Sequence, residues 1–261
     1  MVRDLSKDND LILEVRNLTK QFKVAKNNIL TACDNINLSM YKGKTLGIVG
    51  ESGCGKSTFL RMLMNLEKIT SGEIFYKGRD ISEFSKDEIW ESRQNIQMVY
   101  QDPGASFNPR MKVVDILTEP LINYDRLKKE DKEKKAIELL EMVDLPADFI
   151  HKYPQNMSGG QKQRIGIARA LSLEPEVLVC DEATSALDVS IQKNIIELLV
   201  KLQKERDLCI VFICHDIALV QAFAHEIAVM YLGNVLEVLP GEKLKDSACH
   251  PYTKALLSSL F

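Results

Sequence analysis

A glycine-rich segment near the start of the chain has the composition of a loop that binds phosphate groups. It follows an apolar run at residues 46–49 and precedes a helical pattern at residues 59–64, which is the strand–loop–helix setting that such a loop requires. Glycines let backbone N–H groups turn toward phosphate oxygens, and the helix that starts near Lys56 points its positive end at them. Lys56 adds a full charge, and Ser57 is placed to bind Mg²⁺. The residues expected to hold a nucleotide are Gly50, Ser52, Gly53, Cys54, Gly55, Lys56, Ser57 and Thr58.

A second glycine-containing segment is suited to touch a phosphate that is bound elsewhere. Ser158, Gly159, Gly160 and Gln161 precede a helical run at residues 165–171. They form a helix N-terminus that attracts anions, without a lysine of the phosphate-loop type beside it. A phosphate loop alone is compatible with kinases, GTPases and many ATPases, but a kinase has no use for this second segment.

A pair of carboxylates, Asp181 and Glu182, follows the apolar run at residues 177–180. Hydrolysis of a nucleotide needs a metal anchor and an acceptor for the proton of the attacking water. We assign Asp181 to Mg²⁺, through water, and Glu182 to the general base. In isolation the pair would fit an ordinary turn at the end of a strand, so this assignment depends on the other two segments.

Together the three segments resemble the ABC ATPase family, and the resemblance covers nearly the whole chain. In that family the signature segment of one subunit, here residues 158–161, closes over the γ-phosphate of ATP held by the phosphate loop of the other. The family commonly has a proline after the glutamate, where this chain has Ala183. We expect the carboxylates to be unaffected by that difference.

The resemblance implies roles for four more residues. Gln101 matches the glutamine that contacts Mg²⁺ and water, and His215 matches the histidine that donates a hydrogen bond to the γ-phosphate. Asp188 ends Ser185-Ala186-Leu187-Asp188, which resembles the loop that connects the two sites of the dimer. Phe22 matches the aromatic residue that stacks on adenine, with a simple core phenylalanine as the alternative.

Two further stretches are similar to the peptide and nickel importer branch of the family. They are residues 93–103, with residues 106–111 behind them, and the tetrapeptide His250-Pro251-Tyr252-Thr253. In that branch two different ATPase subunits pair beneath two membrane permeases. An extracytoplasmic binding protein delivers the substrate to these permeases. The resemblance implies that this chain is the second-type ATPase of such a set and does not touch the cargo.

The cargo itself stays open between peptides and nickel or other metal chelates. Many peptide-type members continue beyond the His-Pro-Tyr-Thr element into a cysteine-bearing tail that this chain lacks. That difference and Ala183 favour metal transport modestly.

A soluble ABC ATPase that acts on a non-transport partner is the main alternative. It would usually need two nucleotide-binding units or a long coiled-coil insertion, and the sequence has neither. An exporter would more often carry a fused membrane domain.

Bulk properties exclude several other classes. The 261 residues carry a net charge of −3, so there is no basic field that would attract nucleic acid. The longest apolar stretch, residues 209–214, is far shorter than the roughly 18–20 residues that cross a bilayer, and residues 1–10 lack the apolar core of a secretory signal. Six cysteines without a CxxC pair argue against disulfides or zinc. We therefore expect a peripheral protein on the cytoplasmic face of the membrane.

The elements that position these residues indicate an α/β fold with a P-loop NTPase core. Short apolar runs at residues 46–49, 177–180 and 209–213 predict buried parallel strands, with the nucleotide at their carboxyl ends. Residues 11–15 and 36–40 predict an N-terminal antiparallel β-layer. We expect one domain over residues 1–261, with residues 117–171 inserted as a helical subdomain that carries the signature. A long helix should start near residue 190, with Asp188 or Ser190 as its N-cap.

Overall fold

The computed structural model of the protein describes residues 10–24 and 28–258. Residues 1–9, on which most of the expectation about a secretory signal rests, lie outside the described residues. The chain forms two compact units, one of residues 1–93 with 203–261 and the other of residues 94–202. The assignment of residues 1–261 to one domain with an insertion at 117–171 stays a prediction.

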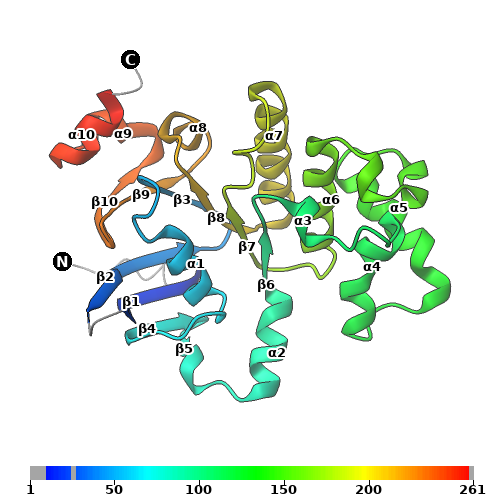
Figure 1. The fold of residues 1–261 in the computed structure, drawn as a ribbon, viewed down its shortest axis with the longest axis horizontal. Helices are drawn as coiled ribbons and strands as arrows, with labels where there is room; N and C mark the ends of the chain where they lie inside the picture. Colours follow the sequence, from blue (N-terminus) through cyan, green and yellow to red (C-terminus); the bar gives the residue numbers. More distant parts are fainter. Residues whose placement is uncertain (1–9, 25–27, 259–261) are drawn as a thin grey trace. The chain divides into compact units, whose positions relative to one another are not determined.

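An antiparallel sheet forms the N-terminal part of the first unit (Figure 1). Its strands are β1 (Leu11–Lys23), β2 (Ile29–Tyr41), β4 (Ser71–Tyr76) and β5 (Arg79–Asp80), in the order β2-β1-β4-β5. Buried Leu13 and Val15 alternate with more exposed neighbours on β1, and Ile36, Leu38 and Met40 do so on β2, as expected for strands with one face in the core. The predicted N-terminal β-layer is confirmed, although both strands extend well beyond the predicted runs.

A second group of strands in the first unit has a mainly parallel arrangement. It contains β3 (Thr45–Val49), β8 (Cys209–Cys214), β9 (Glu226–Tyr231) and β10 (Asn234–Pro240). Strand β3 lies between β8 and β9 and is parallel to both, whereas β10 is antiparallel to β9. Every residue of β3 and β8 is buried, which explains their continuous apolar sequences. The sequence pattern did not predict the β9–β10 hairpin.

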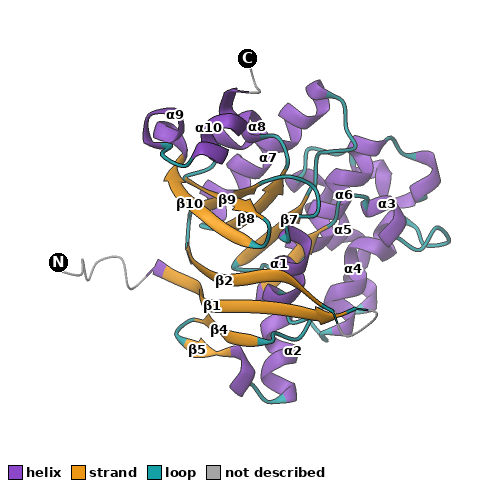
Figure 2. Cartoon of the chain, turned by 60° about the vertical axis from the view of Figure 1, so that its left-hand side comes forward, coloured by secondary structure: helices purple, strands orange, loops and turns teal. Residues whose placement is uncertain are grey.

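Four helices of the first unit flank these strands, as Figure 2 shows in purple. They are α1 (Lys56–Leu63), α8 (Ile217–Gln221), α9 (Leu244–Ser247) and α10 (Pro251–Ser258). Helix α2 (Lys86–Asn95) leads from the first unit into the second. Helix α1 begins directly after the glycine-rich segment, which confirms the strand–loop–helix setting predicted for it.

The second unit combines two parallel strands with a group of helices. Strands β6 (Ile96–Val99) and β7 (Val177–Asp181) pair with each other. The helices are α3 (Pro103–Ser106), α4 (Val113–Asn123), α5 (Lys132–Met142), α6 (Gly159–Leu171) and α7 (Val189–Arg206), whose last turn belongs to the first unit. Fully buried Leu117, Leu140 and Ile165 come from α4, α5 and α6, so these helices share one apolar core. Within the described part of the chain, no helix has the length and hydrophobicity needed to cross a bilayer.

Candidate functional site

The phosphate loop joins β3 to α1 in a backbone conformation that depends on glycine. Gly55 caps α1 with a φ of 111°, a left-handed value that side chains rarely allow. A Cβ atom on Gly55 would lie 2.2 Å from the carbonyl oxygen of Ala32, and one on Gly50 would lie 2.2 Å from that of Met230. Both positions therefore need glycine for space as well as for conformation.

Lys56 lies inside this loop rather than on its surface. Its side-chain ammonium donates hydrogen bonds to the carbonyl oxygens of Gly50 at 2.7 Å and of Glu51 at 2.8 Å, and the residue is only 5% exposed. Ser52 and Ser57 are exposed, and Thr58 is half-buried. The loop thus presents hydroxyl groups to solvent around a buried cation, at the start of a helix whose dipole favours anions.

His215 leaves the sheet beside the phosphate loop. Strands β3 and β8 are parallel, and Val49 pairs with Cys214, so Gly50 and His215 are the next residues of adjacent strands. The imidazole is exposed, while Asp216 accepts hydrogen bonds from Ala218 N at 2.9 Å and Leu219 N at 3.1 Å and so starts α8. The first unit therefore brings the predicted phosphate loop and His215 to one sheet edge.

Phe22 lies on β1 and is half-buried. The ammonium of Lys20 lies 4.7 Å from its ring centroid. That ammonium also donates to Glu67 and to the backbone oxygen of Lys68, both at 2.6 Å. One face of the Phe22 ring therefore borders a fixed cation, and stacking of the ring on adenine stays a prediction.

In the second unit the carboxylate pair and Gln101 leave neighbouring strands. Val99 of β6 pairs with Cys180 of β7, so the residues after both strands emerge at the same edge. The Gln101 amide donates to the Ser185 hydroxyl at 3.1 Å, and this hydroxyl donates to the backbone oxygen of Glu182 at 3.0 Å. Glu182 has a φ of 46°, an uncommon left-handed value for a residue with a side chain.

The signature segment forms the start of α6 through a reciprocal pair of hydrogen bonds. The Ser158 hydroxyl accepts from Gln161 N at 3.3 Å, and the Gln161 side chain accepts from Ser158 N at 3.0 Å, which is a capping box. Gly159 stays exposed, whereas a Cβ atom on Gly160 would lie 2.7 Å from a methyl carbon of Ile191. Ser158 thus caps α6 at the same place where an anion would meet the helix.

Asp188 begins the next long helix. Its carboxylate accepts a hydrogen bond from Ile191 N at 3.0 Å, so Asp188, rather than Ser190, is the N-cap of α7. Ile191 is also the residue beside Gly160. The loop at residues 185–188 therefore connects, within the second unit, to Gln101 through Ser185 and to the signature through α7.

Sequence reasoning missed Gln163. This residue of α6 is 1% exposed, and its side chain donates to the backbone oxygen of Tyr100 at 3.5 Å, one residue before Gln101. Gln163 lies on the same helix face as Ile167 and Ala170, which are buried. A polar residue on an otherwise apolar helix face is the signal in the sequence that could have identified it. Gln163 joins the signature helix to the segment that carries Gln101.

Metal binding and thiol reactivity depend on how the described cysteines and carboxylates are arranged and buried. Within the described residues, no group of three or more His, Cys, Asp or Glu side chains is arranged to hold a metal ion. Burial raises the pKa of Cys33 and of Cys209 to about 12, so these thiols stay protonated at neutral pH.

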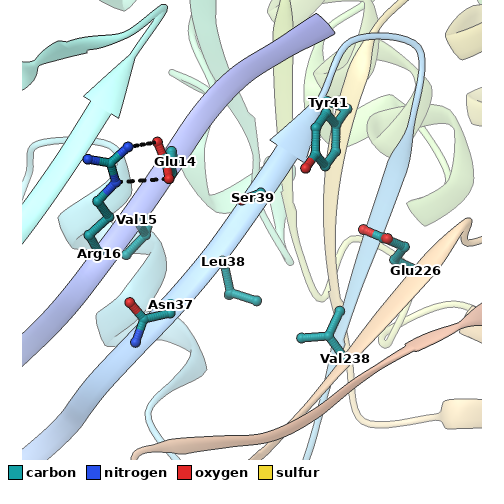
Figure 3. Close-up of a pocket in the computed structure, with 9 residues that line it drawn as sticks. All are labelled: Glu14, Val15, Arg16, Asn37, Leu38, Ser39, Tyr41, Glu226 and Val238. Carbon is teal, nitrogen blue, oxygen red and sulfur yellow. Dashed lines mark hydrogen bonds and ion pairs between the residues drawn. The ribbon is translucent and has the colours of Figure 1, made fainter. Parts of the chain in front are cut away.

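A cavity of about 320 Å³ in the first unit is separate from the nucleotide motifs. It is lined by residues of β1, β2, β9 and β10, among them Glu14, Arg16, Tyr41, Glu226 and Val238. Figure 3 shows that Arg16 and Glu14 are joined by two hydrogen bonds, of 2.9 and 2.7 Å. No residue predicted to hold nucleotide or metal lines this cavity.

Comparison with protein families and curated proteins decides the family. The family model described as ABC transporter matches residues 33–185. The chain is 46% identical to the oligopeptide transport ATP-binding protein AppF of Bacillus subtilis, over 97% of this chain and 79% of AppF. The chain belongs to the ABC transporter ATP-binding family. This ABC ATPase is also 43% identical to OppF of Salmonella typhimurium, an oligopeptide transport ATP-binding protein, over 96% and 78% of the two chains.

Solved structures agree with this assignment. The ATP-binding cassette MJ0796, solved as a dimer in a post-hydrolysis state with ADP and Pi, is 31% identical, with a TM-score of 0.78 over 88% of this chain and 99% of that one. CbiO1 from Clostridium perfringens, part of the ABC transporter complex cbiONQ, is 28% identical, with a TM-score of 0.80 over 91% and 92%. The predicted fold class and the resemblance to ABC ATPases are confirmed, and the protein is an ATP-binding ATPase.

Proposed function

We propose that this ABC ATPase supplies the energy for a membrane importer of peptides. The observation that carries the proposal is the match to oligopeptide transport ATP-binding proteins over almost the whole chain. Nickel or another metal chelate, which the sequence favoured modestly, is the alternative cargo. The names of these relatives favour peptides.

The phosphate loop binds the triphosphate of ATP in this proposal. Backbone N–H groups of Gly53 to Thr58 and the Lys56 ammonium neutralise the phosphate oxygens, and Phe22 stacks on the adenine. An ammonium that already lies inside the loop needs little reorganisation when the nucleotide enters.

Mg²⁺ fits the donor set of this chain. The first unit offers the exposed Ser57 hydroxyl, and the second unit offers the Gln101 amide oxygen and the Asp181 carboxylate. These are the oxygen donors that Mg²⁺ prefers. Such sites obtain their remaining ligands from phosphates and water. Bound there, Mg²⁺ would neutralise charge on the phosphates.

Glu182 acts as the general base for the attacking water, and His215 donates a hydrogen bond to the γ-phosphate. Gln101 orients water next to the metal. The exposed imidazole of His215 and the exposed Gln101 amide are both accessible to a ligand. The hydrogen-bond chain from Gln101 through Ser185 to the backbone of Glu182 would couple the position of the base to that of the glutamine.

The signature at residues 158–161 acts on ATP held by a second ATPase subunit. With one phosphate loop and one signature, this chain completes two sites only by pairing with another ATPase, and the loop at residues 185–188 connects them. The importer comprises this heterodimer on the cytoplasmic face of the membrane, two permeases and an extracytoplasmic substrate-binding protein. This subunit makes no contact with the cargo.

The test is to purify the complex through this chain from its native membrane and to identify its subunits and the ligand of its binding protein by mass spectrometry. We expect two permeases, a second ATPase and bound peptides. A binding protein that carries nickel or a metal chelate would assign the cargo to the alternative. Recovery of a soluble, fully active homodimer without membrane partners would contradict the importer itself.

A further inference from the structure

The tetrapeptide at residues 250–253 builds the start of α10, in the same unit as the phosphate loop. The His250 imidazole accepts a hydrogen bond from Tyr252 N at 3.1 Å. Pro251 is the first residue of α10, a position where the missing N–H of proline costs nothing. Thr253 is fully buried. His250 and Pro251 therefore form the helix start, Thr253 packs into the interior, and Tyr252 projects toward the phosphate loop.

Glu237 of β10 anchors this helix start to the sheet. One of its carboxylate oxygens accepts from Cys249 N at 2.8 Å and from His250 N at 2.9 Å. Burial of Glu237 acts to raise its pKa, but the neighbouring Thr253 side chain and the backbone hydrogen bonds from His250 and Cys249 outweigh it and hold the pKa below the usual 4.5. At neutral pH the carboxylate is therefore ionised, and its charge strengthens both backbone hydrogen bonds.

Tyr252 reaches the phosphate loop from this anchored position. Its ring packs against Tyr231 at the end of β9, with centroids 4.4 Å apart. Its hydroxyl accepts a hydrogen bond from Glu51 N at 3.3 Å. Glu51 is the second residue of the loop, and Tyr252 supplies a partner for its N–H, so this donor is not left unpaired.

The same peptide unit is held at its other end by Lys56. A peptide unit comprises the carbonyl of one residue and the N–H of the next in one plane, so Gly50 O and Glu51 N belong together. Gly50 O accepts from the Lys56 ammonium at 2.7 Å. Gly50 has no side chain to restrict its ψ angle, and the two hydrogen bonds hold the orientation of this plane.

We propose that Tyr252 is a positioning residue for the phosphate loop: its hydroxyl holds the Gly50–Glu51 peptide plane and thereby places the Lys56 ammonium for ATP. The inference rests on the proposed role of residues 50–58 in binding ATP. It gives the His-Pro-Tyr-Thr element a function that is distinct from contact with nucleotide, because the element acts through the backbone of the loop.

Tyr252→Phe in the full chain tests this inference, since it keeps the ring and its packing on Tyr231 and removes only the hydroxyl. We expect the Kd for ATP to rise about three- to tenfold, the size of one neutral hydrogen bond. In the nucleotide-free protein, NMR hydrogen exchange of the Glu51 amide should become faster. Tyr41→Phe is the matched control, because it removes a tyrosine hydroxyl from β2 of the same unit without touching the loop. That variant should match the wild type in both measurements.

Lys56→Ala, measured alongside, separates the two possible failures. If Lys56→Ala loses ATP binding while Tyr252→Phe matches Tyr41→Phe in affinity, the role of Tyr252 is wrong and the phosphate-loop assignment stands. Unchanged exchange of the Glu51 amide in Tyr252→Phe also overturns the role, even if affinity falls. If Lys56→Ala binds ATP as tightly as the wild type, the phosphate-loop assignment fails, and the role of Tyr252 fails with it.

Discussion

At the scale of single residues, Glu182 combines a proposed catalytic role with an uncommon backbone conformation. Its φ of 46° is costly for a residue with a side chain, and the turn after β7 maintains it. Ser185 N donates to the Glu182 backbone oxygen at 3.0 Å, as does the Ser185 hydroxyl. The half-buried carboxylate is thus presented by a rigid turn.

Glu182→Gln should keep ATP affinity and slow hydrolysis by roughly 10²-fold or more, because the amide cannot accept the proton of the attacking water. Steady-state ATPase assays of the assembled transporter measure the rate, and size-exclusion chromatography should show ATP-bound dimers accumulating. Glu197→Gln, on an exposed part of α7, is the control and should behave as the wild type. Near-normal turnover of Glu182→Gln would remove this residue from the role of base.

At the scale of elements, two helix N-termini differ in the chemistry that they present. Helix α1 starts at a glycine cap with a buried lysine, whereas α6 starts at a serine that forms a capping box. The first is suited to hold phosphate with a full charge, and the second offers only neutral donors and its dipole. This difference supports a role in holding ATP for the N-terminus of α1 and a role in closing over ATP for the N-terminus of α6.

Lys56→Ala should abolish most ATP binding by the isolated chain, whereas Ser158→Arg should leave that affinity largely intact and block transport by the complex. Fluorescent-nucleotide titration and uptake into vesicles measure the two effects. Ser158→Ala is the matched control, because it loses the same N-cap, worth about 1 kcal/mol, without adding a large side chain. A loss of ATP affinity in Ser158→Arg as severe as in Lys56→Ala would show that the signature acts within one chain.

Glu237 makes the anchoring of α10 dependent on pH. The folded-state pKa of this carboxyl is held below 4.5, so its contribution to stability is present above that value. The contribution is lost as the pH falls through the lower, folded-state pKa.

We therefore expect the free energy of unfolding of the wild type to fall more steeply than that of Glu237→Gln as the pH is lowered through 4.5 and below. Urea denaturation at several pH values measures this slope. Glu226→Gln, at an exposed position of β9, serves as the control and should keep the wild-type slope. Parallel curves for the wild type and Glu237→Gln would show that this carboxylate does not anchor the helix.

At the scale of the whole molecule, an ATPase that energises import must transmit movement to a membrane partner. The segment after Gln101 is suited to this, because α3 packs on α6: a Cβ atom on Gly166 would lie 2.9 Å from Pro103. Ser106 and Asn108 are exposed beside these contacts. A shift of the signature helix would therefore move the exposed surface at residues 106–108.

Ser106→Cys should cross-link to permease cytoplasmic loops with a yield that changes when ATP is added. The experiment needs a Cys249→Ser background, since Cys249 is the exposed one of the six free cysteines and the other five are buried. Lys254→Cys, exposed on α10, is the control and should give no product. Equal yields from both positions, or no dependence on ATP, would contradict coupling through residues 106–108.

Local patterns in the sequence were enough to predict the motifs whose geometry is local. The phosphate loop, the carboxylate pair and the signature each depend on a strand end or a helix start a few residues away, and hydrophobic periodicity and glycine spacing report such neighbours directly. The three-dimensional structure was needed to find the distant residues that support them. Glu51 and Tyr252 are 201 positions apart, and Gln101 and Ser185 are 84 apart. Contacts at such separations leave no periodic pattern, because strand order and packing, rather than local spacing, bring these residues together.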